Sequence, residues 1–233
     1  MPRNTKYEAF KTRMHLLDVA INEFSIRGYT ATTLMDIAES AGVTRGAIYW
    51  HFANKTELFN EIWMRERPIY EQINQDIYTH PGNSPLYILK MSFTNGLKLV
   101  ASDPKQRNLM NIVFHKCEFG DSMLSGQDIR QRLYINPQRL ASLLNECKHQ
   151  KQLPASINIE HSVNVICAYF TGIIGNWLAY QNVFNLYRDA EQIVSQLIYM
   201  LSYRESESME SVLLGMGEMN KAPAQSGGAQ ERC

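Results

Sequence analysis

The chain has 233 residues, of which 45% are hydrophobic, with 23 Lys plus Arg and 23 Asp plus Glu. This length allows one large buried core or two modest ones, so we expect a soluble globular protein. Because the formal net charge is zero, overall charge does not indicate a nucleic-acid or membrane partner, and any electrostatic argument has to be local.

The N-terminus is basic but does not resemble a targeting segment. Arg3, Lys6, Lys11 and Arg13 are opposed only by Glu8 in the first 15 residues, and such an arm is most simply a solvated terminus. It lacks the apolar core of a signal peptide, and no run approaches the roughly 18 apolar residues of a membrane span. We expect a cytoplasmic protein with no membrane partner. Four scattered cysteines without a C-x-x-C pair favour reduced thiols.

Helical spacing dominates, and no run alternates as a strand would. The first predicted helix ends near Gly28, and its apolar positions are Phe10, Met14, Leu17, Ile21 and Phe24. Thr33 caps a second, short helix and Thr44 caps a third. Either Asn54 or Thr56 opens a fourth. Two short helices joined by a turn with glycine, behind a longer helix, form the helix-turn-helix pattern.

The third predicted helix has a face that suits nucleic acid. Ile48 and Phe52 point inward at i and i+4, and we assign Trp50 and Phe52 mainly to packing against the first and fourth helices. The outward positions are Thr44, Arg45, Gly46, Tyr49 and His51. Residues 40–54 contain no Asp or Glu, as a surface that meets phosphates requires.

The rest of the chain is also predicted to be helical. The stretch "PGNSP" at 81–85 marks a break, and a helix follows over about 86–101. The "SDP" at 102–104 breaks this helix and restarts it. A further helical region runs over about 123–151, where Pro137 marks a kink or break.

Two long apolar helices are predicted over about 159–182 and 189–203. Their apolar surface is wider than one core-facing stripe, which is typical of packing against a second subunit. We therefore expect a homodimer, and a monomer that simply buries both helices is the alternative. The tail from 205 is rich in Ser, Gly, Gln and Met and is most simply disordered.

The segment "TTLMDIAESAGVTRGAIYWHFANKTELFNEIW" at 32–63 resembles the DNA-binding signature of the TetR family of bacterial transcriptional regulators. The segments "IVFHKCEF" at 112–119 and "GIIGNWL" at 172–178 resemble the second domain of the AcrR-type branch, which represses multidrug efflux pump genes. The resemblance spans about residues 5–203.

This resemblance implies an all-α homodimer in which a small molecule bound in the second domain weakens DNA binding. It divides the chain into a helix-turn-helix DNA-binding domain, a helical-bundle ligand-binding and dimerisation domain, and a disordered tail: residues 1–55, 56–204 and 205–233.

Eight residues are candidates for DNA binding: Thr32, Thr33, Thr44, Arg45, Gly46, Tyr49, His51 and Lys55. Near the start of a recognition helix, Arg45 can donate two hydrogen bonds to guanine O6 and N7, and a phosphate clamp is the alternative. Gly46 costs about 1 kcal/mol of helix propensity relative to Ala, which indicates close approach to DNA or to the second helix. Thr44 can cap its helix and contact a phosphate.

The remaining candidates have alternatives of their own. By the resemblance, Tyr49 meets the DNA backbone, or it is a surface tyrosine without a partner. His51 contacts a phosphate, or it packs at the helix end. Lys55 opposes the helix dipole, so a phosphate contact is the economical interpretation. Thr32 and Thr33 match phosphate-contacting family positions, or they are simple caps.

Seven residues are candidates for ligand binding: Trp63, Phe93, Phe114, Glu118, Tyr134, Phe170 and Trp177. Aromatic stripes at helical spacing are more often core than pocket, and it is the resemblance that favours a pocket. The carboxylate of Glu118 beside aromatic faces suits cationic, lipophilic compounds. Its alternative is a structural ion pair with Lys116 or Arg107.

We expect no enzyme, cofactor or metal site. There is no G-x-S-x-G, P-loop or H-E-x-x-H motif. His115 and Cys117 point about 200° apart on a helix and cannot easily share one ion. The predicted function is a repressor that binds a near-palindromic double-stranded DNA operator and is released by a small-molecule inducer that is lipophilic and cationic. The alternatives are an architectural or ligand-independent DNA binder and a pure ligand-binding module.

Overall fold

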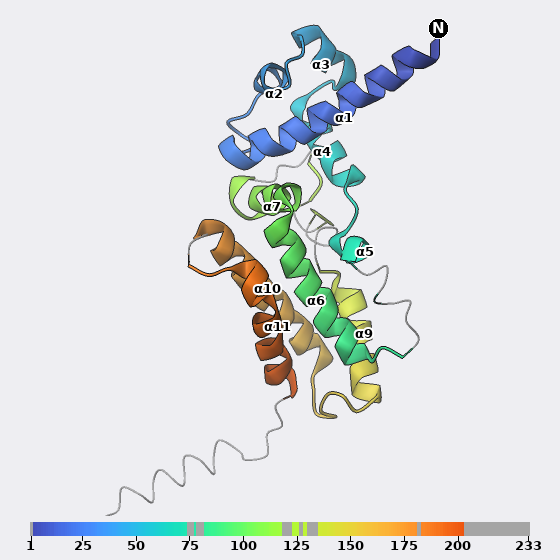
Figure 1. The fold of residues 1–233 in the computed structure, drawn as a ribbon, viewed down its shortest axis with the longest axis vertical. Helices are drawn as coiled ribbons and strands as arrows, with labels where there is room; N and C mark the ends of the chain where they lie inside the picture. The colour runs from blue at the N-terminus through green and yellow to red at the C-terminus, as the bar shows by residue number, and fades with distance from the viewer. Residues whose placement is uncertain are drawn as a thin grey trace, which may run out of the picture.

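The computed structural model describes residues 2–73, 77, 82–117, 123–125, 128–129, 135–180 and 183–202, with side chains from residue 6 onward. Within these residues every regular element is a helix, which confirms the predicted all-α fold. Figure 1 shows α1 to α4 at one end of the long axis and the other helices toward the opposite end. We call these parts the N-terminal unit (residues 2–65) and the C-terminal unit (residues 69–202).

The helices of the N-terminal unit are α1 (Pro2–Arg27), α2 (Leu34–Ser40), α3 (Arg45–His51) and α4 (Lys55–Arg65). Their predicted caps are confirmed. Thr33 Oγ1 accepts a hydrogen bond from the Asp36 N–H at 3.1 Å, and Asp36 Oδ2 accepts one from the Thr33 N–H at 2.7 Å. Thr44 caps α3 and Asn54 caps α4, each through a side-chain oxygen that accepts a backbone N–H. Gly28 follows α1 with a φ of +85°, in the left-handed region that favours glycine.

An aromatic-rich core holds the N-terminal unit together. Phe24 and Phe59 are fully buried, and their rings meet edge to face with centroids 5.7 Å apart. Ile48 and Phe52 anchor α3 in the core, as predicted. Phe10 differs, because 58% of it is exposed. The N-terminal end of α1 projects past the rest of the unit (Figure 1), so the predicted place of Phe10 on the buried stripe is wrong.

The C-terminal unit contains α5 (Ile69–Ile73), α6 (Pro85–Ser102), α7 (Pro104–Asn111), η1 (Ile112–Lys116), α9 (Pro137–His149), α10 (Ile159–Ala179) and α11 (Leu186–Ser202). The predicted "SDP" break is confirmed, because Asp103 ends α6 and caps α7. Pro137 starts α9 behind the capping residue Asn136, where its missing N–H costs nothing. The predicted break at Pro137 is confirmed, and the predicted start of this helical region near residue 123 is wrong, since residues 123–125 are not helical.

The C-terminal unit is built around α6, which packs against α5, α7, α9 and α11. The element η1 is a short π-helix that continues α7 and also packs against α1. The domain boundary between residues 55 and 56 stays a prediction, and it falls at the start of α4, which packs on α1. The predicted tail over 205–233 lies outside the described residues.

The helix α10 is long and apolar enough to cross a membrane by length and composition, so the expectation that no run approaches a span is wrong for this segment. Its 18-residue window has a mean hydropathy of 1.3, and 39% of that window is buried within the chain. One such helix is weak evidence for a span because core helices pass the same test, and α10 packs against α7, α9 and α11. Its remaining apolar surface still needs an explanation.

Candidate nucleic-acid interface and ligand cavity

The outer face of α3 gathers polar and aromatic groups. Thr44, Arg45 and Gly46 are exposed, and 46% of Tyr49 is exposed. The Arg45 guanidinium lies 5.6 Å from the centroid of the Tyr49 ring. A β-carbon at Gly46 would meet only the Thr44 hydroxyl, at 4.0 Å. Packing within the N-terminal unit therefore does not require a glycine at this position, and the second helix no longer explains it.

Trp50 is also part of this outer face, with 72% of the residue exposed. Its ring meets the His51 ring edge to face at 4.6 Å. The predicted packing role is confirmed for Phe52, which is 1% exposed, and is wrong for Trp50. Helical geometry explains the difference, because position 50 lies about 200° around the helix from the buried Ile48. The same geometry would have indicated the exposure of Trp50 from the sequence.

Arg13 joins α1 to the C-terminal end of α3 and to α4. Its Nε donates to Glu61 Oε1 at 2.8 Å, and Nη2 donates to the second carboxylate oxygen. Its Nη1 donates to the backbone carbonyl of His51, and the guanidinium lies 4.3 Å from the Phe52 ring centroid. The sequence reading treated Arg13 only as part of a basic arm. Arg13 precedes the buried Leu17 by four residues, and this spacing would have indicated that Arg13 lies on the inward face of α1.

His51 is 9% exposed, so its predicted outward position is wrong. Burial lowers the pKa of its imidazole below the usual 6.5, and the charge of Arg13 lowers it further. The neutral ring is therefore favoured at the end of α3, where it packs beside Phe52.

Lys55 is directed at backbone carbonyls of the turn between α1 and α2. Its Nζ donates to Tyr29 O at 2.7 Å and to Thr32 O at 2.8 Å, and it lies 4.2 Å from the Tyr29 ring centroid. Burial lowers the pKa of the Lys55 ammonium. Thr32 is fully buried, and its hydroxyl donates to Gly28 O at 2.7 Å. Of the two predicted threonines, only Thr33 is exposed. Lys55 and Thr32 therefore stabilise this turn through their hydrogen bonds to its backbone carbonyls.

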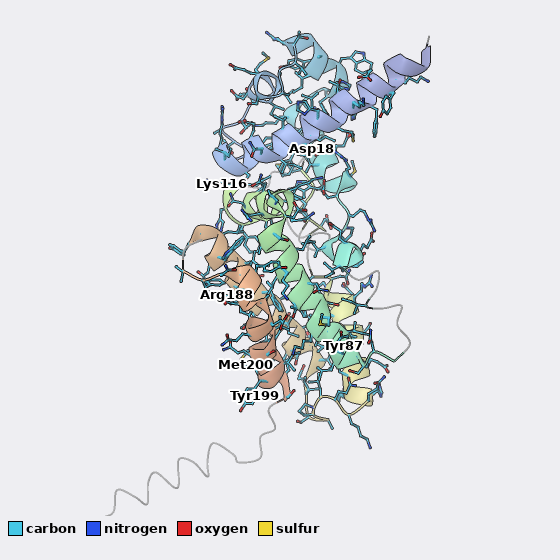
Figure 2. The ribbon with its side chains drawn as sticks, in the orientation of Figure 1. Asp18, Tyr87, Lys116, Arg188, Tyr199 and Met200 are labelled. Atoms are coloured by element: carbon cyan, nitrogen blue, oxygen red, sulfur yellow. The ribbon has the colours of Figure 1, made fainter. Side chains whose placement is uncertain are left out.

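The same turn contacts the C-terminal unit at what we call the unit junction (Ser25, Tyr29, Asn108, Asn111 and Lys116). The backbone N–H of Tyr29 donates to Lys116 O, at the end of η1, at 2.9 Å. Asn111 Nδ2 donates to Ser25 O at 3.0 Å, and Ser25 Oγ donates to Asn108 Oδ1 at 3.1 Å. Figure 2 shows Lys116 beside the last turn of α1. A shift of η1 would therefore reach the turn before α2 directly.

A small apolar cavity lies among α5, α6 and α10. Its volume is about 40 Å³, and it is lined by Ile69, Ile73, Ser92, Phe93, Gly96, Leu97, Val100, Ile135, Phe170 and Ile174. The rings of Phe93 and Phe170 are stacked at 4.2 Å with an angle of 12° between their planes. A second hollow of about 70 Å³ adjoins it toward α9 and shares Ile73, Ser92, Phe93 and Ile135. Drug-sized ligands need about 300–1,000 Å³, so neither hollow admits one without movement of its lining side chains.

The predicted ligand residues fall into several places. Phe93 and Phe170 line the cavity together. Trp63 is buried in α4 against Phe59, and its Nε1 has no hydrogen-bond partner in the described part of the chain. Phe114 packs against Gly175 of α10.

Trp177, like Trp63 and Phe114, does not line the cavity. Trp177 lines a separate, more polar hollow of about 590 Å³, where its ring faces the Arg107 guanidinium at 5.4 Å. Glu118 and Tyr134 lie outside the described residues. Their roles stay predictions.

The fold and the exposed face of α3 define a helix-turn-helix regulator with an attached helical unit. Comparisons with known proteins agree. The family described as "Bacterial regulatory proteins, tetR family" matches residues 16–62, and the family described as "MAATS-type transcriptional repressor, C-terminal region" matches residues 84–203. The chain belongs to the TetR family of bacterial transcriptional regulators and is a DNA-binding protein rather than an enzyme.

Individual relatives cover most of the chain. The "Probable acrEF/envCD operon repressor" of Escherichia coli (strain K12) is 39% identical over 200 residues, which is 86% of this chain and 91% of that protein. The regulator AcrR of Shigella flexneri is 36% identical over 201 residues, covering 86% and 94%. The crystal structure of NalD, the secondary repressor of the MexAB-OprM multidrug efflux pump in Pseudomonas aeruginosa, matches with a TM-score of 0.66 and 26% identity. That match covers 86% of this chain and all of the other.

Proposed function

We propose that this protein represses a multidrug efflux operon by binding a near-palindromic operator as a dimer, and that a lipophilic small molecule releases it. The supporting observation is the similarity along nearly the whole chain to a probable operon repressor and to the efflux repressor NalD. The chemistry of α3 and of the cavity supports the same function.

DNA binding is assigned to the exposed outer face of α3. Arg45 reads a guanine edge, and Thr44 and Tyr49 contact phosphates beside it. Gly46 lets the backbone approach the groove, since nothing inside the protein requires a glycine there. We add Trp50 to this set, because its ring is largely exposed on a helix that carries no acidic residue. Thr33 contacts a phosphate at the start of α2.

Lys55, His51 and Thr32 support the interface from within. Three observations support this assignment: Lys55 is half-buried with its ammonium on backbone carbonyls, His51 is buried, and the Thr32 hydroxyl is bonded to Gly28. In this proposal they hold the two short helices in position instead of contacting DNA. This assignment replaces the phosphate contacts that the sequence suggested for them.

The ligand occupies the closed cavity and the adjoining hollow after their side chains move apart. None of the described lining residues is acidic, and only Ser92 is polar in the smaller cavity. This composition favours a lipophilic ligand with a flat ring that enters beside the stacked Phe93 and Phe170. A preference for cations rests on Glu118 alone. The Nε1 of Trp63, which has no partner among the described residues, is a donor that a ligand acceptor would satisfy.

Release of DNA follows from movement at the unit junction. Phe114 is part of η1, and the last residue of η1 accepts the Tyr29 N–H. A ligand that moves α10 or η1 would pull on the turn before α2 and change the spacing of the two recognition helices in the dimer. Operator half-sites one turn apart require a spacing of roughly 34–36 Å, so a small change weakens binding.

The dimer forms through α10 and α11. Most of the apolar window of α10 is not buried within one chain, and α11 exposes 72% of Tyr199 and 50% of Met200 (Figure 2). A second subunit covers this surface and explains the apolar composition of α10 without a membrane.

The function is tested with DNA selected from a random pool by the purified protein. Binding to the selected palindrome should weaken steeply with salt and on addition of lipophilic dyes. Arg45→Ala should cost about 1–3 kcal/mol and relax the base preference. Trp50→Ala should weaken binding with an unchanged Tm. If dyes neither bind nor loosen the complex, the protein is a ligand-independent DNA binder. If DNA affinity does not depend on salt, the protein is not a DNA-binding repressor.

A further inference from the structure

The inward stripe of α1 changes its chemistry along the helix. Leu17 and Phe24 are buried on this stripe, and Arg13 on the same stripe is bonded to the end of α3. Continuing toward the N-terminus, the stripe carries Phe10 and then Lys6, at the helical spacings of three and four residues. The covered part of the stripe therefore ends at Arg13, and the uncovered part carries one ring and one cation, Phe10 and Lys6.

On the N-terminal side of Arg13, this stripe of α1 is exposed. Phe10 is 58% exposed, and Lys6 is exposed as well. At 1.5 Å per residue, Lys6 lies roughly 10 Å farther along the axis than Arg13. Figure 1 shows the N-terminal end of α1 at the same end of the molecule as α3. An exposed cation and an exposed ring thus continue outward from the point where α1 holds the recognition helix.

A second cation on the same segment behaves differently. Lys11 pairs with Glu8 at 3.6 Å and lies 4.6 Å from the Tyr7 ring centroid. It is five residues from Lys6, which places it about 140° around the helix. Among the described residues Lys6 has no ion-pair partner, so its charge is available to an external anion.

We propose that the first turns of α1 are a second DNA contact, in which Lys6 binds a backbone phosphate outside the base pairs read by α3. The Phe10 ring packs against the deoxyribose next to that phosphate. The occupant is duplex DNA because the surface continues from the DNA-facing helix and carries the opposite charge to a phosphate. This inference rests on the proposed function, since it requires that α3 lies in the groove.

The test compares Lys6→Gln with the matched control Lys11→Gln, using the selected palindrome with eight or more flanking base pairs on each side. Each dimer should lose two phosphate contacts on Lys6→Gln. The slope of log affinity against log salt concentration should then become shallower by roughly 1.8, since each contact contributes about 0.9. Lys11→Gln should leave the slope unchanged. On a duplex that ends at the palindrome and has no flanking base pairs, the slope for the wild type should equal the slope for Lys6→Gln.

The outcomes separate the two claims. Equal slopes for the wild type and Lys6→Gln on the long duplex would overturn the second contact and leave the repressor intact. Equal losses for Lys6→Gln and Lys11→Gln would show a diffuse charge effect and would also overturn it. If the affinity of the wild type for DNA did not depend on salt, the proposed function itself would be wrong. Because both lysines are exposed, an unchanged Tm confirms that each variant folds.

Discussion

Replacing Gly96 by alanine should stabilise the protein and at the same time make it less sensitive to its ligand. Gly96 lies within α6 and lines the apolar cavity. A β-carbon there would stand 3.8 Å from side-chain atoms of Ile69 and Ile73, which is ordinary van der Waals contact. Alanine gains about 1 kcal/mol of helix propensity over glycine, and burial of the methyl group adds up to about 0.8 kcal/mol.

We therefore expect the free energy of unfolding to rise by about 1–2 kcal/mol, which raises Tm by roughly 2–8 °C for a chain of this size. The new methyl group occupies part of a cavity of only about 40 Å³. A ligand has to displace it or bind elsewhere, so the ligand concentration needed to release the operator should rise roughly tenfold, which corresponds to about 1.4 kcal/mol.

Thermal unfolding and ligand titration of the DNA complex measure the two effects. Asn95→Ala is the matched control, because residue 95 precedes Gly96 by one position within α6 but does not line the cavity. It should raise Tm through helix propensity alone and leave the ligand response unchanged. If Gly96→Ala is more stable but responds to ligand like the wild type, the ligand does not use this cavity. A lower Tm for Gly96→Ala would contradict the packing argument.

Two further predictions concern the N-terminal unit. Lys55→Met removes two short charge-assisted hydrogen bonds to the carbonyls of Tyr29 and Thr32. The free energy of unfolding measured in urea should therefore fall by about 2–3 kcal/mol. If the variant is as stable as the wild type but its DNA binding depends less steeply on salt, Lys55 contacts a phosphate instead. The pKa of His51 is lowered in the folded state, so below pH 6.5 the unfolded chain binds more protons and stability should fall on acidification. Tm measured between pH 7.5 and 5 should fall less for His51→Gln, and equal slopes would refute a burial effect at this residue.

Local patterns in the sequence were enough to predict most of the fold. The caps at Thr33 and Thr44 were predicted correctly, and Asn54 was one of two predicted caps for α4, because a cap depends on residues only two or three positions away. The break at Asp103 follows from the proline behind it for the same reason. The start of the helical region near residue 123 was predicted less well, since residues 123–125 are not helical.

The candidate DNA-binding face was predicted only in part. The buried Ile48 and Phe52 determine which way α3 faces, so the outward positions of Arg45 and Tyr49 follow from helical periodicity. His51 at the end of the helix escaped this rule. Its environment depends on Arg13, 38 residues earlier, which no local pattern could place beside it.

The sequence by itself determined that this protein is an all-α regulator with a helix-turn-helix, because helix caps, periodicity and the motif at 32–63 are local properties of the chain. Only the tertiary structure decided which cations have partners within the chain. The sequence suggests a phosphate contact for Lys55 and a solvated arm for Arg13, but folding brings them to backbone carbonyls and to Glu61, where those partners replace water. Lys6 is exposed and has no ion-pair partner among the described residues, because the N-terminal end of α1 projects past the helices that hold Arg13.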